Sequence, residues 1–434
     1  MISLSEKLKA LGVQIGARNL PPPRPRKPYA IEKVVPGRFE ATPYGEIYLA
    51  EKRYPLDHRQ GCSPLRVTSP LHVIAEWANE PRLAEMGPDA LAFLDTETTG
   101  LATGAGTYAF MVGVGRYDGV SFQLVQFFMR DPAEELALLA ALTAFLQPCR
   151  ALVTFNGKAF DVPLLNARYI AACYLAQDED LPLVSLAHLD LLPLARRLWR
   201  DRLPSRALGS LEECILGVPR TGEDVPGWMI PELYFDYLRS GDARPLQGVF
   251  YHNAMDVLSL AALLGHMAGL LANPFDDAAL HGLDIVAMGK LFEALGHIET
   301  AVGLYERGLA CDLPGEAYWQ TVQRLSFVEK RRDNLPAAVA LWREAADQGQ
   351  IYAHVELAKF YEHRRRDYAE ALQWTRAALD RVNAPDCPQH ERFRWLAGLE
   401  HRLARLQRKS DYSPRPTTDY HDSAERGWPG CHGG

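Results

Sequence analysis

The sequence of 434 residues has no paired cysteines, no apolar run of membrane-spanning length and no net positive charge, and each absence narrows the classes of protein to consider. Its seven cysteines are an odd number, and none forms a Cys-x-x-Cys pair or lies near histidines at the spacing of a zinc site. This pattern predicts reduced thiols in the cytoplasm and argues against a disulfide scaffold or a zinc centre. Residues 1–17 alternate charged and apolar residues, so we expect neither a secretory signal nor a membrane partner.

The net charge of −7 looks unfavourable for a protein that binds nucleic acid. It is a poor criterion, however, because carboxylates grouped to hold divalent cations add negative charge that the metal balances. Local clusters matter more. Residues 1–36 hold seven Lys or Arg against two Glu, and five arginines lie between Arg196 and Arg206. Each cluster could be a phosphate track or simply a solvated face.

The chain contains segments of different periodicity. Residues 1–36 form a basic, proline-rich segment, and residues 37–88 alternate around a Thr-Pro-Tyr-Gly turn that is typical of a small β-hairpin. Residues 89–272 contain three strands in a meander and then strands alternating with helices. This order predicts an α/β domain with a mixed sheet flanked by helices.

Residues 276–408 have helical periodicity throughout, and they repeat. Three stretches align at spacings of 37 and 33 residues, namely Ala301–Leu309, Ala338–Ala346 and Ala371–Leu379. Because these spacings are close to the 34-residue helix-turn-helix period, the segment resembles a tetratricopeptide array, with an unrelated helical bundle as the alternative. Such an array would bind a protein partner. Residues 409–434 are polar, and we expect a disordered tail.

Two carboxylates directly follow a buried apolar strand. Asp95 and Glu97 are two residues apart, and in an extended chain they point to the same side, where they would present oxygens to hard divalent cations. Asp161 follows a second apolar strand, although capping a helix is the usual role of Asp there. Asp256 lies in a strongly apolar helix, where a carboxylate needs a partner. Because every candidate ligand is a carboxylate, the sequence predicts Mg²⁺ or Mn²⁺.

In this order, the motifs resemble those of the four-carboxylate (DEDD) exonucleases of the ribonuclease H-like superfamily, over roughly residues 89–271. Those enzymes use Asp-x-Glu, then Asn-x-x-x-Phe-Asp, then Tyr or His ahead of a last Asp. Further signatures resemble the YprB-type ribonuclease H-like family: His188–Leu192, Arg196–Trp199, Val225–Pro231 and His252–Asn253. The resemblance implies a five-stranded mixed sheet flanked by helices, followed by an all-α tetratricopeptide-like repeat domain.

The resemblance also implies a 3′–5′ exonuclease that hydrolyses single-stranded DNA or RNA with two ions about 3.5–4 Å apart. Asp95 would bridge both ions, Glu97 and Asp256 would each help to hold one, and Asp161 would complete the set. Further nucleic-acid contacts would come from Thr98, Lys158, Arg196 and Arg197. Internal cleavage remains an alternative, as does a nucleic-acid-binding scaffold with vestigial catalysis that acts through its repeats.

The third motif departs from the family pattern. Tyr-type enzymes place tyrosine four residues before the last Asp, and His-type enzymes place histidine five before it, whereas here His252 is four before Asp256 and Tyr251 is five before it. We expect His252 to activate or orient the attacking water, because imidazole titrates near neutrality. Tyr251 is the reserve candidate, and a histidine that only packs the helix is the alternative. Asp190 is expected to be structural and not a fifth ligand.

Overall fold

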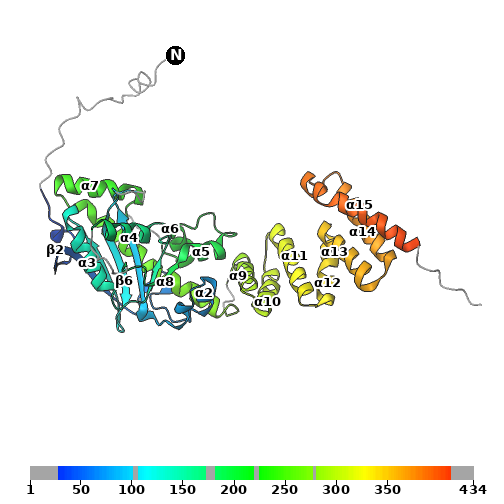
Figure 1. Cartoon of the computed structure of the whole chain (residues 1–434), viewed down its shortest axis with the longest axis horizontal. Coiled ribbons are helices and arrows are strands. Elements are labelled where there is room, and N and C mark those ends of the chain that lie inside the picture. The colour runs from blue at the N-terminus through cyan, green and yellow to red at the C-terminus, as the bar shows by residue number, and fades with distance from the viewer. Residues whose placement is uncertain (1–27, 101–105, 173–180, 219–223, 277–279, 412–434) are drawn as a thin grey trace, which may run out of the picture. The chain divides into compact units, whose positions relative to one another are not determined.

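The computed structural model describes residues 28–100, 106–172, 181–218, 224–276 and 280–411, and the chain divides into two compact units, Met1–His297 and Ile298–Gly434 (Figure 1). Most of the N-terminal segment expected at 1–36 and of the tail expected at 409–434 lies outside the described residues. The first unit includes helix α9 (Gly282–Ala294), which the sequence pattern grouped with the repeats.

A mixed sheet forms the centre of the first unit. Within the described residues it has seven strands in the order β1-β2-β7-β6-β5-β8-β9. Their bounds are β1 Arg38–Thr42, β2 Gly45–Pro55, β5 Leu91–Thr98, β6 Ala109–Tyr117, β7 Ser121–Phe128, β8 Ala151–Thr154 and β9 Ala187–Asp190. The pairs β5–β8 and β8–β9 are parallel, and the other neighbours are antiparallel. The expected mixed sheet is confirmed; β5 to β9 supply the five expected strands, and the β1–β2 hairpin adds two at the β7 edge.

Helices cover both faces of this sheet. Helix α8 (Gln247–Ala272) contacts β5, β6 and β7, and the Gln126 side chain of β7 donates to the backbone carbonyl of Phe250 in this helix at 2.8 Å. The next residue, Phe127, points to the opposite face, where its ring lies 5.7 Å from Phe145 of α3 (Glu135–Leu146). One face of the sheet therefore packs against α8 and the other against α3.

The remaining elements of the first unit are short. A small two-stranded sheet pairs β3 (Arg59–Gln60) with β4 (Ser63–Pro64). The other helices are α2 His72–Trp77, α4 Asp161–Ala171, α5 Leu191–Trp199, α6 Leu208–Leu211 and α7 Ile230–Ser240. The five cysteines in the described part of the chain are free, as the sequence predicts.

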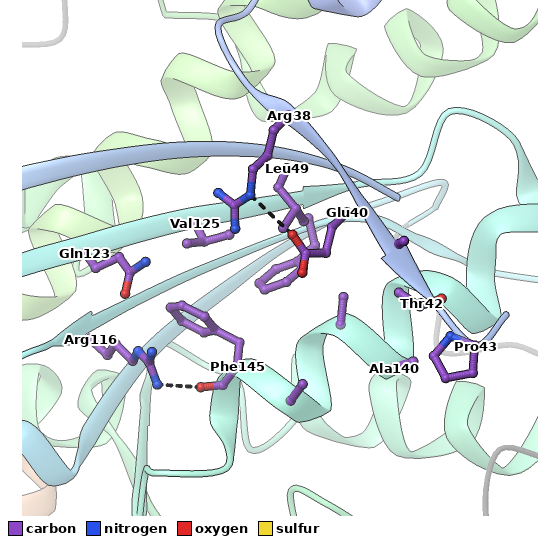
Figure 2. Close-up of a pocket in the computed structure, with 14 residues that line it drawn as sticks. Arg38, Glu40, Thr42, Pro43, Leu49, Arg116, Gln123, Val125, Ala140 and Phe145 are labelled. Atoms are coloured by element: carbon purple, nitrogen blue, oxygen red, sulfur yellow. Dashed lines mark hydrogen bonds and ion pairs between the residues drawn. The ribbon is translucent and has the colours of Figure 1, made fainter. Parts of the chain in front are cut away.

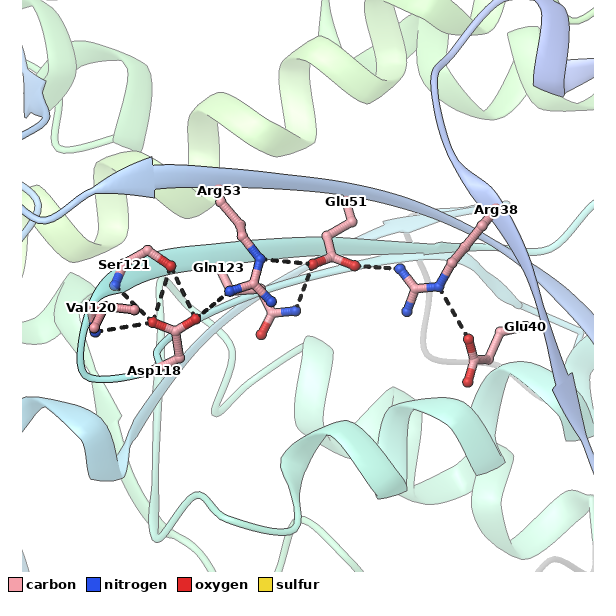
Figure 3. A network of polar contacts seen from close by, with 8 residues as sticks. All are labelled: Arg38, Glu40, Glu51, Arg53, Asp118, Val120, Ser121 and Gln123. Atoms are coloured by element: carbon pink, nitrogen blue, oxygen red, sulfur yellow. Dashed lines mark hydrogen bonds and ion pairs between the residues drawn. The ribbon is translucent and has the colours of Figure 1, made fainter.

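Polar contacts tie the β1–β2 hairpin to the rest of the sheet (Figure 3). Arg38 pairs with Glu40 and Glu51, and Arg53 pairs with Glu51 and with Asp118 in the β6–β7 turn. The arginines are about half exposed, so each pair contributes at most about 1 kcal/mol. Apolar burial therefore does more to hold the hairpin, since Ile47 and Tyr48 of β2 are fully buried.

A cavity of about 360 Å³ lies between this hairpin and α3 (Figure 2). Its lining includes Val125 and Phe127 of β7 and Phe145 of α3. Because Gln126 points to α8 and its two neighbours point the other way, the cavity is on the face of the sheet opposite α8. None of the candidate carboxylates lines it.

The segment Arg244–Ala272, which ends with α8, is long and apolar enough to cross a membrane by length and composition, and its most apolar 18-residue window has a mean hydropathy of 1.6. The expectation that no apolar run reaches this length is therefore wrong. The sequence pattern underestimated it because His252 and Asp256 interrupt the apolar run near its start. The helix packs on the central sheet, and 61% of its most apolar window is buried inside the fold. A core helix of a globular domain passes the same test.

The second unit consists of successive helices, each of which contacts the next. They are α10 Ile298–Leu309, α11 Gly315–Arg331, α12 Leu335–Asp347, α13 Ile351–Phe360, α14 Tyr368–Asn383 and α15 Gln389–Asp411. The aligned residues Ala301, Ala338 and Ala371 lie near the starts of α10, α12 and α14, and all three are fully buried. A small residue at these positions lets neighbouring helices approach closely. The region is consistent with a helical repeat domain, and its assignment to the tetratricopeptide type remains a prediction.

Candidate active site

Two carboxylates come from the end of β5, the central strand between β6 and β8. Asp95 pairs in register with Gly113 of β6, and Gly113 pairs with Gln126 of β7, so Asp95 lies on the α8 face. Glu97 points to the same side two residues later and is buried. The ladder shifts register between Glu97 and Thr98, which ends regular pairing directly after the second carboxylate.

Two further carboxylates approach from helices. Asp256 lies in the first half of α8, and Asp161 is the first residue of α4. Asp161 does not cap its helix, because Phe160 occupies the N-cap position; its carboxylate instead accepts a hydrogen bond from the Thr96 hydroxyl at 2.5 Å. The structure thus brings the four carboxylates predicted from the sequence to one place, at the end of β5.

The charges of these four groups act on one another. Burial, followed by the nearby charges of Asp256, Glu97 and Asp161, raises the pKa of Asp95 well above its ordinary value. Burial and the charges of Asp256, Asp161 and Asp224 do the same for the pKa of Glu97. Burial raises the pKa of Asp161 to about 6, against the opposing hydrogen bond from Thr96. Without a bound cation, it is therefore energetically costly to ionise all of these carboxyl groups together.

A divalent cation fits this cluster chemically. Hard cations such as Mg²⁺ prefer carboxylate oxygens, and a bound cation would remove the repulsion that raises the pKa values of Asp95 and Glu97. Within the described residues, no group of three or more His, Cys, Asp or Glu side chains is arranged so that it could hold a metal ion as it stands. The fit therefore rests on the donor set and its charge, and side-chain adjustment would complete the coordination.

An amide that the sequence reasoning missed as a site residue orients Asp95. The Asn253 side chain donates to Asp95 Oδ2 at 2.9 Å, and its own oxygen accepts from the Gln126 amide at 3.0 Å. Space for this arrangement depends on Gly113, because a Cβ added there would lie 2.1 Å from Asn253 Oδ1. The available signal was the position of Asn253 directly after His252 in the third motif.

His252 is buried on the same face of α8 as Asp256. Its Nε2 lies 3.6 Å from Asp256 Oδ2, and its Nδ1 lies 2.7 Å from Asp224 Oδ1. In the neutral ring, only one nitrogen carries a proton. If Nδ1–H donates to Asp224, Nε2, which faces Asp256, carries none. The sequence reasoning also missed Asp224, whose only signal was its place directly before the Val225–Pro231 signature. Tyr251 is half-buried.

Asp190 organises the loop that leads to Asp161. Its carboxylate accepts from the backbone N–H groups of Asn156 and Lys158, at 2.8 and 3.1 Å, and from that of Leu192 at 3.0 Å. Asn156 has a positive φ of 65°, a conformation that Asn tolerates better than most residues. Because these three hydrogen bonds all come from backbone N–H groups, Asp190 positions the loop, which is the structural role expected from the sequence.

The four predicted nucleic-acid contacts come from three different elements and differ in their surroundings. The Thr98 hydroxyl donates to the Gly100 carbonyl at 2.8 Å, and Lys158 is exposed on the loop before α4. Arg196 is exposed on α5, whereas Arg197 donates to the carbonyl of Lys290 in α9. In the same arginine-rich segment, Arg202 pairs with the buried Asp284 of α9 at 3.0 Å. Much of this segment therefore serves helix packing.

Comparisons with known proteins agree with this arrangement. A family model described as the RNase H superfamily matches residues 92–268, so the first unit has a ribonuclease H-like domain. The "Uncharacterized protein YprB" of Bacillus subtilis (strain 168) is 32% identical over 371 residues, which are 83% of this chain and 86% of that protein. The chain belongs to the YprB family of ribonuclease H-like proteins.

Among solved structures, the family B DNA polymerase of the hyperthermophilic archaeon Pyrobaculum calidifontis is similar, with a TM-score of 0.32 and 18% identity. The match covers 47% of this chain and 29% of the polymerase chain, so this chain corresponds to less than a third of that enzyme.

Proposed function

We propose that the protein is a divalent-metal-dependent nuclease that releases nucleotides from the 3′ end of single-stranded DNA or RNA. Membership of the RNase H superfamily supports nuclease-type function. The observation that carries the proposal is the close approach of Asp95, Glu97, Asp161 and Asp256. Burial and then mutual repulsion raise the pKa values of Asp95 and Glu97. A fold has no structural reason to bury such a set without a cation to balance it.

In this proposal the residues of the site have different roles. Asp95, Glu97, Asp161 and Asp256 would hold Mg²⁺ or Mn²⁺, which when bound activates water and stabilises the departing 3′ oxygen. Asn253 keeps the Asp95 carboxylate in one orientation, and Thr96 does the same for Asp161. His252 would accept a proton from the attacking water at Nε2, and Asp224 would orient the ring through Nδ1.

A product ladder tests the proposal directly. Purified full-length protein is incubated with 5′-labelled single-stranded DNA or RNA in Mg²⁺, in Mn²⁺ and in excess EDTA. We expect a ladder that shortens one nucleotide at a time, only with metal. A few internal fragments at early times would indicate an endonuclease. Unchanged cleavage in EDTA would contradict the metal mechanism, and binding with no cleavage would favour a nucleic-acid scaffold.

A chain that ends at His297 is expected to fold and to cleave a short oligonucleotide about as fast as the full chain. Helix α9 belongs with this unit, because it contacts α5 and supplies Asp284 to Arg202. Repeat modules bind partners and do not build catalytic sites, so the second unit would instead contact a protein partner. Circular dichroism and initial cleavage rates check this prediction.

The matched comparison is a chain that ends at Asn273, which also lacks α9. It leaves Arg202 without its buried carboxylate partner and should therefore melt at a lower temperature than the chain that ends at His297. A folded but inactive chain ending at His297 would show that the second unit takes part in catalysis.

A further inference from the structure

The Val225–Pro231 signature forms a short, rigid bridge beside the candidate active site. Immediately before it, Asp224 is held by His252 Nδ1 at 2.7 Å. Near its end, Ile230 is buried in the core and begins α7. Between these points the Met229 N–H donates to the Pro226 carbonyl at 2.8 Å and closes a single helical turn, Gly227–Met229. Pro226 and Pro231 restrict the backbone further, so the bridge is fixed before any ligand binds.

This bridge presents one large aromatic side chain to solvent. Trp228 is 75% exposed, which is more than any other large aromatic residue in the described part of this unit; Tyr44 and Phe275 follow at 49%. Trp228 is four residues from Asp224, so the two Cα atoms are at most about 14 Å apart even in an extended chain. The backbone at Trp228 therefore lies within the length of a few nucleotides of Asp224, which contacts His252 beside Asp256.

Charge around the site favours an uncharged contact with the substrate. The candidate site is built from four carboxylates, and the nearest charged residues on either side of Trp228, Asp224 and Glu232, are also acidic. Phosphate groups gain little from such a surface beyond what bound metal supplies. An aromatic ring can still bind a nucleobase, because stacking does not depend on positive charge and every base has a flat face.

We propose that Trp228 is a stacking platform for a nucleobase of the strand whose phosphate lies at the carboxylates. This rests on the proposed nuclease function and identifies the substrate class more closely, as a strand with unpaired bases. Because the backbone of the turn is already closed by the Met229–Pro226 hydrogen bond, only the two side-chain torsions of Trp228 have to be fixed on binding. Stacking on every base alike predicts affinity for single strands with little sequence preference.

The experiment measures binding separately from cleavage. Full-length protein carrying Asp95→Asn, which is not expected to consume the strand, is titrated against a 5′-fluorescein-labelled single strand, and anisotropy gives the Kd. Adding Trp228→Ala should raise the Kd by roughly 5- to 100-fold, and Trp228→Phe should recover most of the loss. Phe275→Ala is the matched control, because Phe275 is 49% exposed and follows the opposite end of α8 from His252.

Single abasic nucleotides placed in turn along the 3′-terminal part of the strand separate stacking from a structural effect. At one position, the abasic strand should bind Trp228 and Trp228→Ala proteins equally, because the base that would stack is gone. The proposal would be overturned if Trp228→Ala raised the Kd by the same factor for every strand, abasic or not. It would also be overturned if Trp228→Ala left the Kd unchanged, a result that would favour a protein partner as the ligand of Trp228. Should Trp228→Ala fail to fold, a Trp228→Phe protein that binds normal and abasic strands alike would also overturn it. Cleavage retained by Asp95→Asn would instead contradict the nuclease assignment.

Discussion

Replacing Asp95 by Asn is expected to lower phosphodiester hydrolysis by at least about 10³-fold, which corresponds to about 4 kcal/mol in the activation barrier. Burial raises the pKa of Asp95, and the charges of Asp256, Glu97 and Asp161 all raise it further. Loss of its charge should therefore weaken the binding of both cations. Single-turnover cleavage of a labelled strand in Mn²⁺ measures the effect. Asp57→Asn, a change at an exposed aspartate of the same unit, is the matched control and should leave the rate unchanged.

The same variant should be more stable than the parent when metal is removed. The folded-state pKa of Asp95 is raised, so its stabilising contribution is present at low pH and is lost as pH rises above the ordinary value of 3.8 and through the raised pKa. At pH 7.5 an uncharged Asn avoids this cost, and the Tm in EDTA should rise. Added Mg²⁺ should stabilise the parent more than the variant. A lower Tm in EDTA, or retained cleavage, would contradict this account of the site.

Local sequence signals were sufficient for most of the central sheet. The apolar strand expected before Asp161 corresponds to β8, Ala151–Thr154, and the three strands of the expected meander correspond to β5, β6 and β7. Buried strands leave such runs because both of their faces are covered. The partner of β2 was not predictable in this way. Its pairing, for example Tyr48 with Phe128, joins residues far apart in the chain, and local periodicity contains no information about that choice.

The candidate site shows the same division between local and long-range information. The carboxylates stood out because their types and spacing suit a metal. Their supporting groups did not, because each acts across the fold: Thr96 on Asp161, and Asp224 on His252. A threonine in a strand or an aspartate before a proline-rich turn has many ordinary explanations. Only the tertiary contacts distinguish these residues from their neighbours.

The apolar setting of Asp256 predicted that this carboxylate needs a partner. The charges that act on Asp95 and Glu97 include Asp256, so this carboxylate adds to the repulsion in the site. His252 is one partner of this carboxylate, with its Nε2 3.6 Å from Asp256 Oδ2. The remaining repulsion among the carboxylates is what a divalent cation would relieve, and the net charge of −7 is compatible with such a site.

Substitution of His252 by Ala is expected to lower turnover by about 10²–10⁴-fold, whereas Tyr251→Phe should have little effect. Residues four apart on a helix share a face, and His252 Nε2 is 3.6 Å from Asp256 Oδ2. Tyr251, one residue earlier, is rotated away from that face. If His252 takes the proton of the attacking water, its removal leaves the metal-dependent part of catalysis intact, so slow cleavage should persist in Mn²⁺.

Asp224→Asn distinguishes a chemical role for His252 from a packing role. The carboxylate of Asp224 orients the ring through Nδ1, so an amide there should lower turnover and leave the KM for the strand nearly unchanged. If His252 only packs the helix, Asp224→Asn should lower stability and leave the turnover of the folded protein nearly unchanged. Slow turnover in Tyr251→Phe with normal turnover in His252→Ala would show that tyrosine is the assisting residue. Near-normal rates in both would mean that neither side chain takes part, and that the carboxylates with their cations suffice.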